Sequence, residues 1–252
     1  LREPLRVFVH GLMMMKDGKM SKSKGNVIPV PPLVERFGVD AVRYYLCREI
    51  PFGQDGQFTP EQFVDCLNTD LANNFGNLVN RTISMIWKYY DGVIPTYDGE
   101  KNALDTALKE KAEKTIRTYE ILSDDLKVTD AYASVMELVS AANKYIEDSA
   151  PWALAKDPAK KEELASCMSH LANTIFLAGT LLSPVLVTKI PEMYEQLGVP
   201  VEQRNYETAT HFGSLGGVSV KKGSPLFPRL NTEEEIAFIV NLMKAPKEKA
   251  AA

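Results

Sequence analysis

The sequence predicts a mainly α protein, in which the end of an α/β domain (residues 1–58) is followed by an antiparallel helix bundle (residues 59–252). Two observations predict this class. Residues 5–9 (LRVFV) are a short apolar run bounded by proline and glycine, which is typical of a strand. From Thr59 onward, apolar residues recur at helical spacing in several long segments. A lone strand cannot bury itself, so we expect its sheet partners to lie upstream, in the same polypeptide or in a separate chain.

Start and stop signals place the helices in order. Thr59 before Pro60 is an N-cap followed by proline at the first helical position. Thr232 with Glu235 three residues later is a capping box for the last helix. An extended loop rich in glycine, serine and proline is expected over 213–228. The predicted helices cover residues 30–49, 59–91, 104–122, 129–147, 157–182, 189–197 and 232–244.

Composition indicates an ordinary globular protein with an uneven charge. Hydrophobic residues make up 45% and charged residues 25% of the 252 residues, which is the usual balance of a folded domain. The net charge is −4, yet residues 1–26 carry six basic and two acidic side chains, a local charge of +4 that leaves −8 for the remainder. An acidic body with one basic loop is not a general nucleic-acid binder, so any RNA contact has to be local and specific.

Cysteine usage and hydropathy indicate a cytoplasmic protein that does not enter a membrane. The three cysteines are few, odd in number and widely spaced, which argues against a disulfide framework. The longest apolar run, residues 174–187, is too short for a bilayer and contains proline, so we expect a buried helix. Cys167 and His170 share a helix face, but two ligands do not make a zinc site, and we expect this chain to bind no metal.

The most informative motif is KMSKS at residues 19–23, which lies between Gly18 and Gly25. Two lysines and two serines on such a loop can donate hydrogen bonds to a polyphosphate and neutralise charge as it shifts to a leaving pyrophosphate. The glycines give the loop the mobility that closing over a ligand requires. The alternative from the residues alone is a solvated basic loop, because lysine and serine are common in loops.

KMSKS, extended to KMSKSKGN, resembles the second signature of class I aminoacyl-tRNA synthetases, which activate an amino acid with ATP and transfer it to tRNA. The resemblance implies a Rossmann-type catalytic domain that ends within residues 1–58, and ATP with Mg²⁺ as the cofactor. It implies that Lys19 and Lys22 are catalytic and stabilise the triphosphate in the transition state. It also implies an ATP-binding set of Lys19, Met20, Ser21, Lys22 and Ser23.

The family's first signature, a His-x-Gly-His type motif, and its amino-acid pocket are absent from this sequence. We therefore expect the chain alone to be inactive and to need an N-terminal catalytic half. Residues 37–46 resemble the connection between catalytic core and helix bundle, and residues 49–56 (EIPFGQDG) are similar to methionyl-tRNA synthetases in particular. That family usually has an acidic residue where this chain has Gln57. The implied function is ligation of methionine to tRNA-Met, with residues 59–252 as the anticodon-binding domain.

The helix predicted over 59–91 contains four asparagines within residues 73–80, although each costs a helix about 0.6 kcal/mol relative to alanine. Asn73, Asn77 and Arg81 fall on one face over ~12 Å, where they can hydrogen-bond unpaired bases. From spacing alone, bonds to neighbouring helices explain the asparagines as well. The row is similar to the anticodon-reading row of methionyl-tRNA synthetases, which implies recognition of the CAU anticodon.

The two tryptophans receive different interpretations. Pro151 ends a predicted helix and places Trp152 just past its end, where an indole ring can stack on a base. A tryptophan buried in the bundle explains the residue equally well on physics alone, but the pair resembles the proline and tryptophan that support the anticodon in the family. Trp87 has no such match, and we expect it in the core.

Three alternatives remain at this point: another class I synthetase, a tRNA-binding module without catalysis, and a small nucleotidyltransferase with a related lysine loop. The row of Asn73, Asn77 and Arg81 together with Trp152 distinguishes methionine from the other amino acids of the class. The intact KMSKS motif argues against a module that only binds tRNA. The long helical region exceeds what a small nucleotidyltransferase needs.

Overall fold

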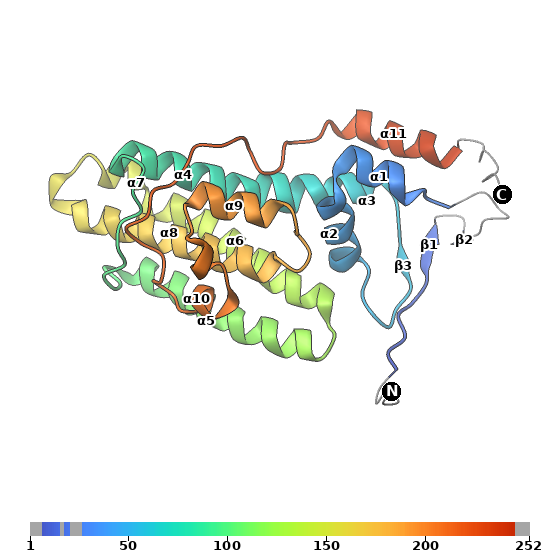
Figure 1. Cartoon of the computed structure of the whole chain (residues 1–252), viewed down its shortest axis with the longest axis horizontal. Helices are drawn as coiled ribbons and strands as arrows, with labels where there is room; N and C mark the ends of the chain where they lie inside the picture. The colour runs from blue at the N-terminus through green and yellow to red at the C-terminus, as the bar shows by residue number, and fades with distance from the viewer. Residues whose placement is uncertain (1–6, 16–17, 21–26, 245–252) are drawn as a thin grey trace.

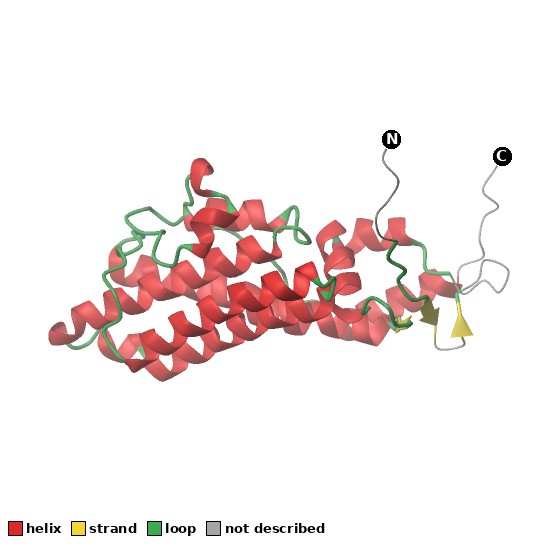
Figure 2. Cartoon of the chain, turned by 90° about the horizontal axis from the view of Figure 1, so that it is seen from below, coloured by secondary structure: helices red, strands yellow, loops and turns green. Residues whose placement is uncertain are grey.

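The computed structural model describes residues 7–15, 18–20 and 27–244. The molecule is elongated, with a helix bundle toward one end and a small sheet toward the other (Figures 1 and 2). The predicted mainly α class, with the end of an α/β domain followed by an antiparallel bundle, is confirmed.

The α/β part holds a three-stranded sheet in the order β2–β1–β3. The strand β1 pairs with β2 in antiparallel fashion, with Met14 opposite Lys19, and with β3 in parallel fashion, with Met13 opposite Gly56. The strands are β1 (Met13–Met15), β2 (Gly18–Lys19) and β3 (Gly56–Gln57).

The strand predicted at residues 5–9 is wrong for its described part. Val7, Phe8 and Val9 are exposed and belong to no strand, while residues 5 and 6 lie outside the described residues. The strand of this region is β1 instead, where Met15 is buried. An apolar run becomes a strand only where a partner backbone faces it, and within the described chain β2 and β3 lie opposite residues 13–15.

The helix predicted over 30–49 is two helices. They are α1 (Val30–Phe37) and α2 (Val39–Glu49). Gly38 separates them with a φ of 84°, a backbone conformation that glycine adopts without steric cost. The polypeptide therefore turns sharply between the segment that follows KMSKS and the helix that leads to the bundle.

The long helix predicted over 59–91 is continuous but changes its winding. Thr59 caps it by accepting a 3.1 Å hydrogen bond from the Gln62 amide, as predicted. The chain then passes through α3 (Pro60–Cys66), a π-helix (Leu67–Gly76) and α4 (Asn77–Tyr90). A π-helix is rare and concentrates at functional sites, because it turns side chains away from the regular α-helical register.

The remaining helices complete the bundle. Most agree with the predicted segments to within a few residues, but the short helices at Pro151–Leu154 and Tyr206–Thr210 have no counterpart among those segments. The loop over 213–228 is extended, as predicted, although it contributes an isolated β-bridge at Ser219. The helices are α5 (Ala103–Asp124), α6 (Val128–Ser149), α7 (Pro151–Leu154), α8 (Lys161–Leu182), α9 (Lys189–Leu197), α10 (Tyr206–Thr210) and α11 (Thr232–Lys244), with short 3-10 turns at Pro158–Lys160 and Val201–Gln203.

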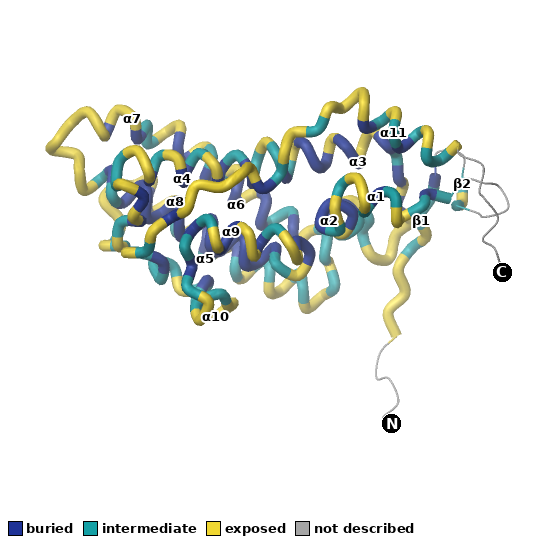
Figure 3. Tube along the Cα trace, turned by 45° about the horizontal axis from the view of Figure 1, so that its top comes forward, coloured by how far each residue is buried: buried dark blue, intermediate teal, exposed yellow. Residues whose placement is uncertain are grey.

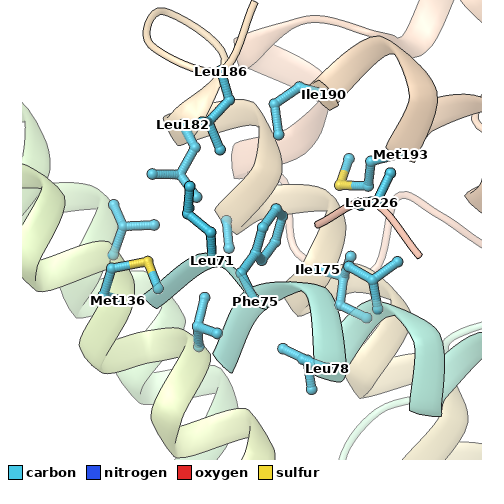
Figure 4. Packing of buried hydrophobic residues seen from close by; sticks show 14 of the residues in the cluster. Leu71, Phe75, Leu78, Met136, Ile175, Leu182, Leu186, Ile190, Met193 and Leu226 are labelled. Carbon is cyan, nitrogen blue, oxygen red and sulfur yellow. The ribbon is translucent and has the colours of Figure 1, made fainter. Parts of the chain in front are cut away.

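The core of the bundle is built around α8 (Figure 3). Among the described residues, the stretch Pro158–Leu182 is long and apolar enough to cross a membrane by length and composition, but 94% of its apolar window is buried inside the molecule. It is therefore the central core helix. Figure 4 shows Ile175 and Leu182 of α8 near Leu71 and Phe75 of the π-helix, which anchor the apolar side of that helix and leave its polar side facing outward.

The last helix, α11, begins where predicted, but the predicted capping box is wrong. Asn231 caps the helix instead, by accepting a 3.4 Å hydrogen bond from the Glu234 amide. Glu235 does not return to the helix start, because its carboxylate forms two hydrogen bonds with the guanidinium of Arg36 in α1. The Glu235 side chain therefore pairs with Arg36 across the interface of α1 and α11 instead of capping its own helix.

Candidate nucleic-acid interface

The predicted row of Asn73, Asn77 and Arg81 lines one wall of an open groove of about 420 Å³. The π-helix carries Asn73, and α4 carries the other two. Thr69, one turn earlier, extends the same wall. Leu71 and Phe75 are buried in the core on the opposite side of the helix. The side chains of the row therefore point away from the core.

The facing wall of the groove comes from α6. It is made by four polar residues that the sequence analysis did not single out: Ser140, Asn143, Lys144 and Glu147. Their spacing of three, four and seven positions forms a polar stripe beside the apolar stripe of α6, and this signal was available in the sequence. The groove therefore presents donors from both walls and an acidic group from one of them.

Asn74 has a structural role, unlike its neighbour Asn73. Its side-chain amide donates to the Ser140 hydroxyl at 2.9 Å and accepts from the Asn143 amide at 2.9 Å. Asn143 also donates to the Asn74 backbone carbonyl at 3.2 Å. These bonds join the two walls at the floor of the groove, so the alternative of asparagines that bond neighbouring helices is correct for this one position.

Arg81 forms an ion pair with Glu147 across the groove. A guanidinium nitrogen lies 2.6 Å from a carboxylate oxygen, and the two side chains are 32% and 57% exposed. A pair this open to solvent contributes little to stability, on the order of 0–1 kcal/mol. The guanidinium can therefore exchange this partner for a phosphate or a base at small cost.

Trp152 is exposed, so the alternative of a buried tryptophan is wrong. It is the second residue of α7 and follows Ala150 and Pro151; Ala150 ends α6 with a φ of 44°. The left-handed turn and Pro151 redirect the chain, and 43% of the tryptophan surface remains accessible. Trp152 does not line the groove itself; it belongs to α7, which follows the end of α6 that carries Glu147.

The expectation that Trp87 lies in the core is also wrong. It is 36% exposed at the edge of the α4 apolar stripe, next to the fully buried Ile86. Its ring packs against Gly92, where an added Cβ would lie 3.0 Å away, and the Lys222 ammonium is 5.0 Å from the ring centroid. The helix α4 packs only one apolar stripe against the core, and Trp87 falls just outside this stripe.

The KMSKS motif is described in part. Gly18 and Lys19 form β2, with Lys19 exposed and Met20 half-buried against the core. Ser21, Lys22 and Ser23 lie outside the described residues. The structure thus places the first predicted catalytic lysine at the end of a short antiparallel hairpin with β1, and the following described segment leads through the buried Ile28 into α1.

Among the described residues, no group of three or more histidine, cysteine, aspartate or glutamate side chains is placed to hold a metal ion. Cys167 and His170 are both buried. His170 bonds the Ser166 carbonyl through Nδ1 at 2.8 Å, and Cys167 lies 3.4 Å from the Ser149 hydroxyl. Both residues therefore belong to the packed interior of α8.

Comparison with known families identifies the family of the chain. Residues 1–83 match the family described as "tRNA synthetases class I (M)". Residues 94–242 match the "Anticodon binding domain of methionyl tRNA ligase", and this match covers more than half of the chain. The chain belongs to the methionyl-tRNA ligase family. The predicted membership of this family is thereby confirmed.

Relatives in this family match the chain over nearly all of its length. Methionine–tRNA ligase of Bacillus subtilis is 52% identical over 243 residues, which are 96% of this chain and 36% of that protein. The enzyme of Halalkalibacterium halodurans is 47% identical, over 97% of this chain and 37% of its own length. The chain thus spans slightly more than a third of these curated relatives.

Solved structures in the family share the fold. Mycobacterium tuberculosis methionyl-tRNA synthetase bound by methionyl-adenylate matches with a TM-score of 0.84 and 33% identity, over 90% of this chain and 45% of that one. The apo form of the same enzyme matches with a TM-score of 0.82 and 30% identity, over 92% and 45% of the two chains.

Proposed function

We propose that the full-length protein is a methionine–tRNA ligase, which activates methionine with ATP and transfers it to tRNA-Met in the cytoplasm. The observation that carries the proposal is the polar groove lined by Asn73, Asn77 and Arg81, on a chain 52% identical to a ligase of that name. The groove supplies amide and guanidinium donors on a rigid helix, the groups that read the edges of unpaired bases.

The two ends of the chain have different tasks in this proposal. Residues 1–58 complete the catalytic domain, and residues 59–252 form the anticodon-binding domain. The chain alone is inactive, because methionine binding and the first class I signature belong to an N-terminal half, on the same polypeptide or a separate chain.

The KMSKS residues act on the triphosphate. Lys19 and Lys22 stabilise the charge that develops on the leaving pyrophosphate, because a fixed positive charge in a partly desolvated site favours the transition state. Met20, Ser21 and Ser23 complete the ATP contact. Mg²⁺ enters with the ATP phosphates.

The groove and Trp152 together read the CAU anticodon. Asn73 and Asn77 hydrogen-bond base edges, and Arg81 contacts a base or a phosphate after leaving Glu147. The exposed indole of Trp152 supports one anticodon base by stacking, a contact worth roughly 1–3 kcal/mol per base.

The test is methionine-dependent exchange of pyrophosphate into ATP by the full-length protein, followed by aminoacylation of tRNA-Met. Exchange with methionine and charging of tRNA-Met are expected. Exchange with leucine, isoleucine, valine or cysteine instead would assign the protein to another class I synthetase. Tight binding of tRNA-Met without any exchange would show a binding module and contradict the proposal.

A further inference from the structure

The C-terminal helix α11 is attached to the segment that follows KMSKS, although about 200 residues separate the two in sequence. Figure 1 shows α11 lying alongside α1 and α3, away from the rest of the C-terminal half. The chain reaches this position after crossing the length of the bundle through the extended loop over 213–231. The attachment has two anchors, one at each side of the start of α11.

The first anchor ties the entry of α11 to the π-helix. The Asn68 side-chain amide donates to the Leu230 carbonyl at 3.1 Å, and its oxygen accepts from the Leu230 amide at 2.8 Å. Asn68 is buried, so both bonds form away from solvent. A side chain that pairs with both backbone groups of one residue fixes the position and direction of the chain there.

The second anchor ties α11 to α1. Arg36 donates to both carboxylate oxygens of Glu235, at 3.0 and 2.8 Å, and to Glu234 at 2.8 Å. The side chain of Glu235 is 9% exposed. A carboxylate this buried needs a charged, well-aligned partner, because an unpaired buried charge is strongly unfavourable. The two-point geometry also restricts rotation of α1 against α11.

Aromatic packing reinforces the second anchor. The Phe238 ring lies under the Arg36 guanidinium at 5.3 Å and meets the Phe37 ring edge-on at 6.0 Å. Phe37 in turn meets Phe63 of α3 at 5.1 Å, and Ile239 is fully buried beside them. The C-terminal end of α1 is thus held by charge on one side and by rings on the other.

The Arg36 side of this contact lies close in sequence to the KMSKS motif. The helix α1 begins at Val30, seven positions after Ser23, and is fixed to the core by Ile28 and Leu33. A rotation of α1 therefore changes the position of the described residues 27–29, which connect this helix to the motif in sequence. A displacement of about 1 Å at a reacting group costs up to 100-fold in rate.

We infer that α11 is a brace for α1, and that Arg36 and Glu235 are positioning residues for the use of ATP by this family of enzymes. The inference rests on the proposed ligase function and deepens it. It assigns to the end of the anticodon-binding half a role in the ATP step, in addition to closing the bundle.

The test uses the full-length enzyme and the variants Glu235→Gln and Arg36→Lys. Both keep a polar side chain of similar size and remove the two-point charged contact. The expected result is a rise of about 5- to 10-fold in KM for ATP in the exchange reaction, with KM for methionine and Kd for tRNA-Met unchanged. Glu233→Gln is the matched control, because Glu233 is an exposed neighbour outside the pairing with Arg36.

A charge-swap variant separates positioning from folding. Arg36→Glu combined with Glu235→Arg restores an ion pair and is expected to return KM for ATP to near the wild-type value. An unchanged KM for ATP in Glu235→Gln and Arg36→Lys, with only a lower Tm, would reduce the contact to a structural one and overturn the inference. Absence of exchange activity in the wild-type enzyme would instead refute the proposed function.

Discussion

Arg81 of α4 and Glu147 of α6 face each other across the groove, 2.6 Å apart at their nearest charged atoms. The ion pair occupies the Arg81 guanidinium and places the Glu147 carboxylate on the facing wall of the groove. In the proposed function, an RNA that binds in the groove has to replace this carboxylate as the partner of the Arg81 guanidinium. Glu147 thus disfavours the binding of any RNA that cannot replace it as the partner of Arg81.

Glu147→Gln should therefore raise the affinity for anticodon hairpins in general and narrow the preference for the cognate one. An increase of about 3- to 10-fold for non-cognate hairpins is expected, because one repulsive charge is removed and Arg81 is released. Filter binding or fluorescence anisotropy at fixed salt measures this. Glu137→Gln is the control, since Glu137 lies on the same helix and pairs with Lys111 outside the groove. Equal affinities for wild type and Glu147→Gln would contradict this interpretation of the ion pair.

Trp152→Ala should weaken tRNA-Met binding by roughly 10- to 100-fold, the range that loss of one base-stacking contact gives. The exchange reaction should stay unchanged, and so should the Tm, because the side chain is largely exposed. The matched control is Trp87→Phe, a change at the other partly exposed tryptophan, which should leave binding intact. A large fall in Tm for Trp152→Ala would show that the ring supports the fold.

Lys22→Ala in the full-length enzyme should slow methionine activation by about 100-fold, as removal of a group that stabilises transition-state charge does. The Kd for tRNA-Met should change little, because in the proposed function Lys22 acts on ATP and the groove residues bind the anticodon. Pre-steady-state adenylate formation and tRNA binding, measured on the same preparation, test the two halves of the statement. Lys16→Ala, three positions before the motif, is the control; an equal loss of both activities in Lys22→Ala would disprove the assigned role.

The acid sensitivity of the bundle should depend partly on Glu100. The Lys109 ammonium, 2.7 Å away, and the Tyr97 hydroxyl lower the pKa of this carboxyl from its ordinary 4.5 to about 2. The folded state therefore binds the proton more weakly than the unfolded state, so the stabilisation is complete above pH 4.5 and is lost as the pH falls toward 2.

Glu100→Gln should consequently lower the Tm by about 1–3 °C at pH 7, and the difference from wild type should shrink as the pH falls below 4.5. Thermal unfolding followed by circular dichroism across this range measures it. Glu110→Gln, at an exposed position of the nearby helix α5, should show no such pH-dependent difference. A gap that stays constant down to pH 3 would disprove the linkage.

Local signals in the sequence predicted most of the helices and the row on the long helix. The helix start at Thr59 and Pro60 and the helical spacing of apolar residues depend only on nearby residues. The structure places them as expected. The row of Asn73, Asn77 and Arg81 was predictable because it depends on helical spacing alone, and the change of winding in the π-helix does not break it.

The errors arose where a distant partner decides the outcome. The capping box predicts a local role for Glu235, but its carboxylate accepts hydrogen bonds from Arg36, about 200 residues away in sequence. The strand was placed on the most apolar run, whereas β1 forms where β2 and β3 offer hydrogen bonds. The polar stripe of α6 can be seen in its spacing, but its place opposite the row of Asn73, Asn77 and Arg81 depends on how the two helices pair, which neither helix reveals alone.

Recognition of the anticodon by the groove of Asn73, Asn77 and Arg81 is tested most directly by one measurement of RNA binding. The full-length protein is titrated with an anticodon stem-loop bearing CAU and with the same hairpin changed at one anticodon base, at near-physiological salt. The same titrations are made with Asn77→Ala and with the control Asn80→Ala, since Asn80 is exposed on the same helix but does not line the groove. A clear preference for CAU that Asn77→Ala abolishes and Asn80→Ala retains is the predicted result. Equal binding of both hairpins by the wild-type protein, or a preference that survives Asn77→Ala, would contradict the account.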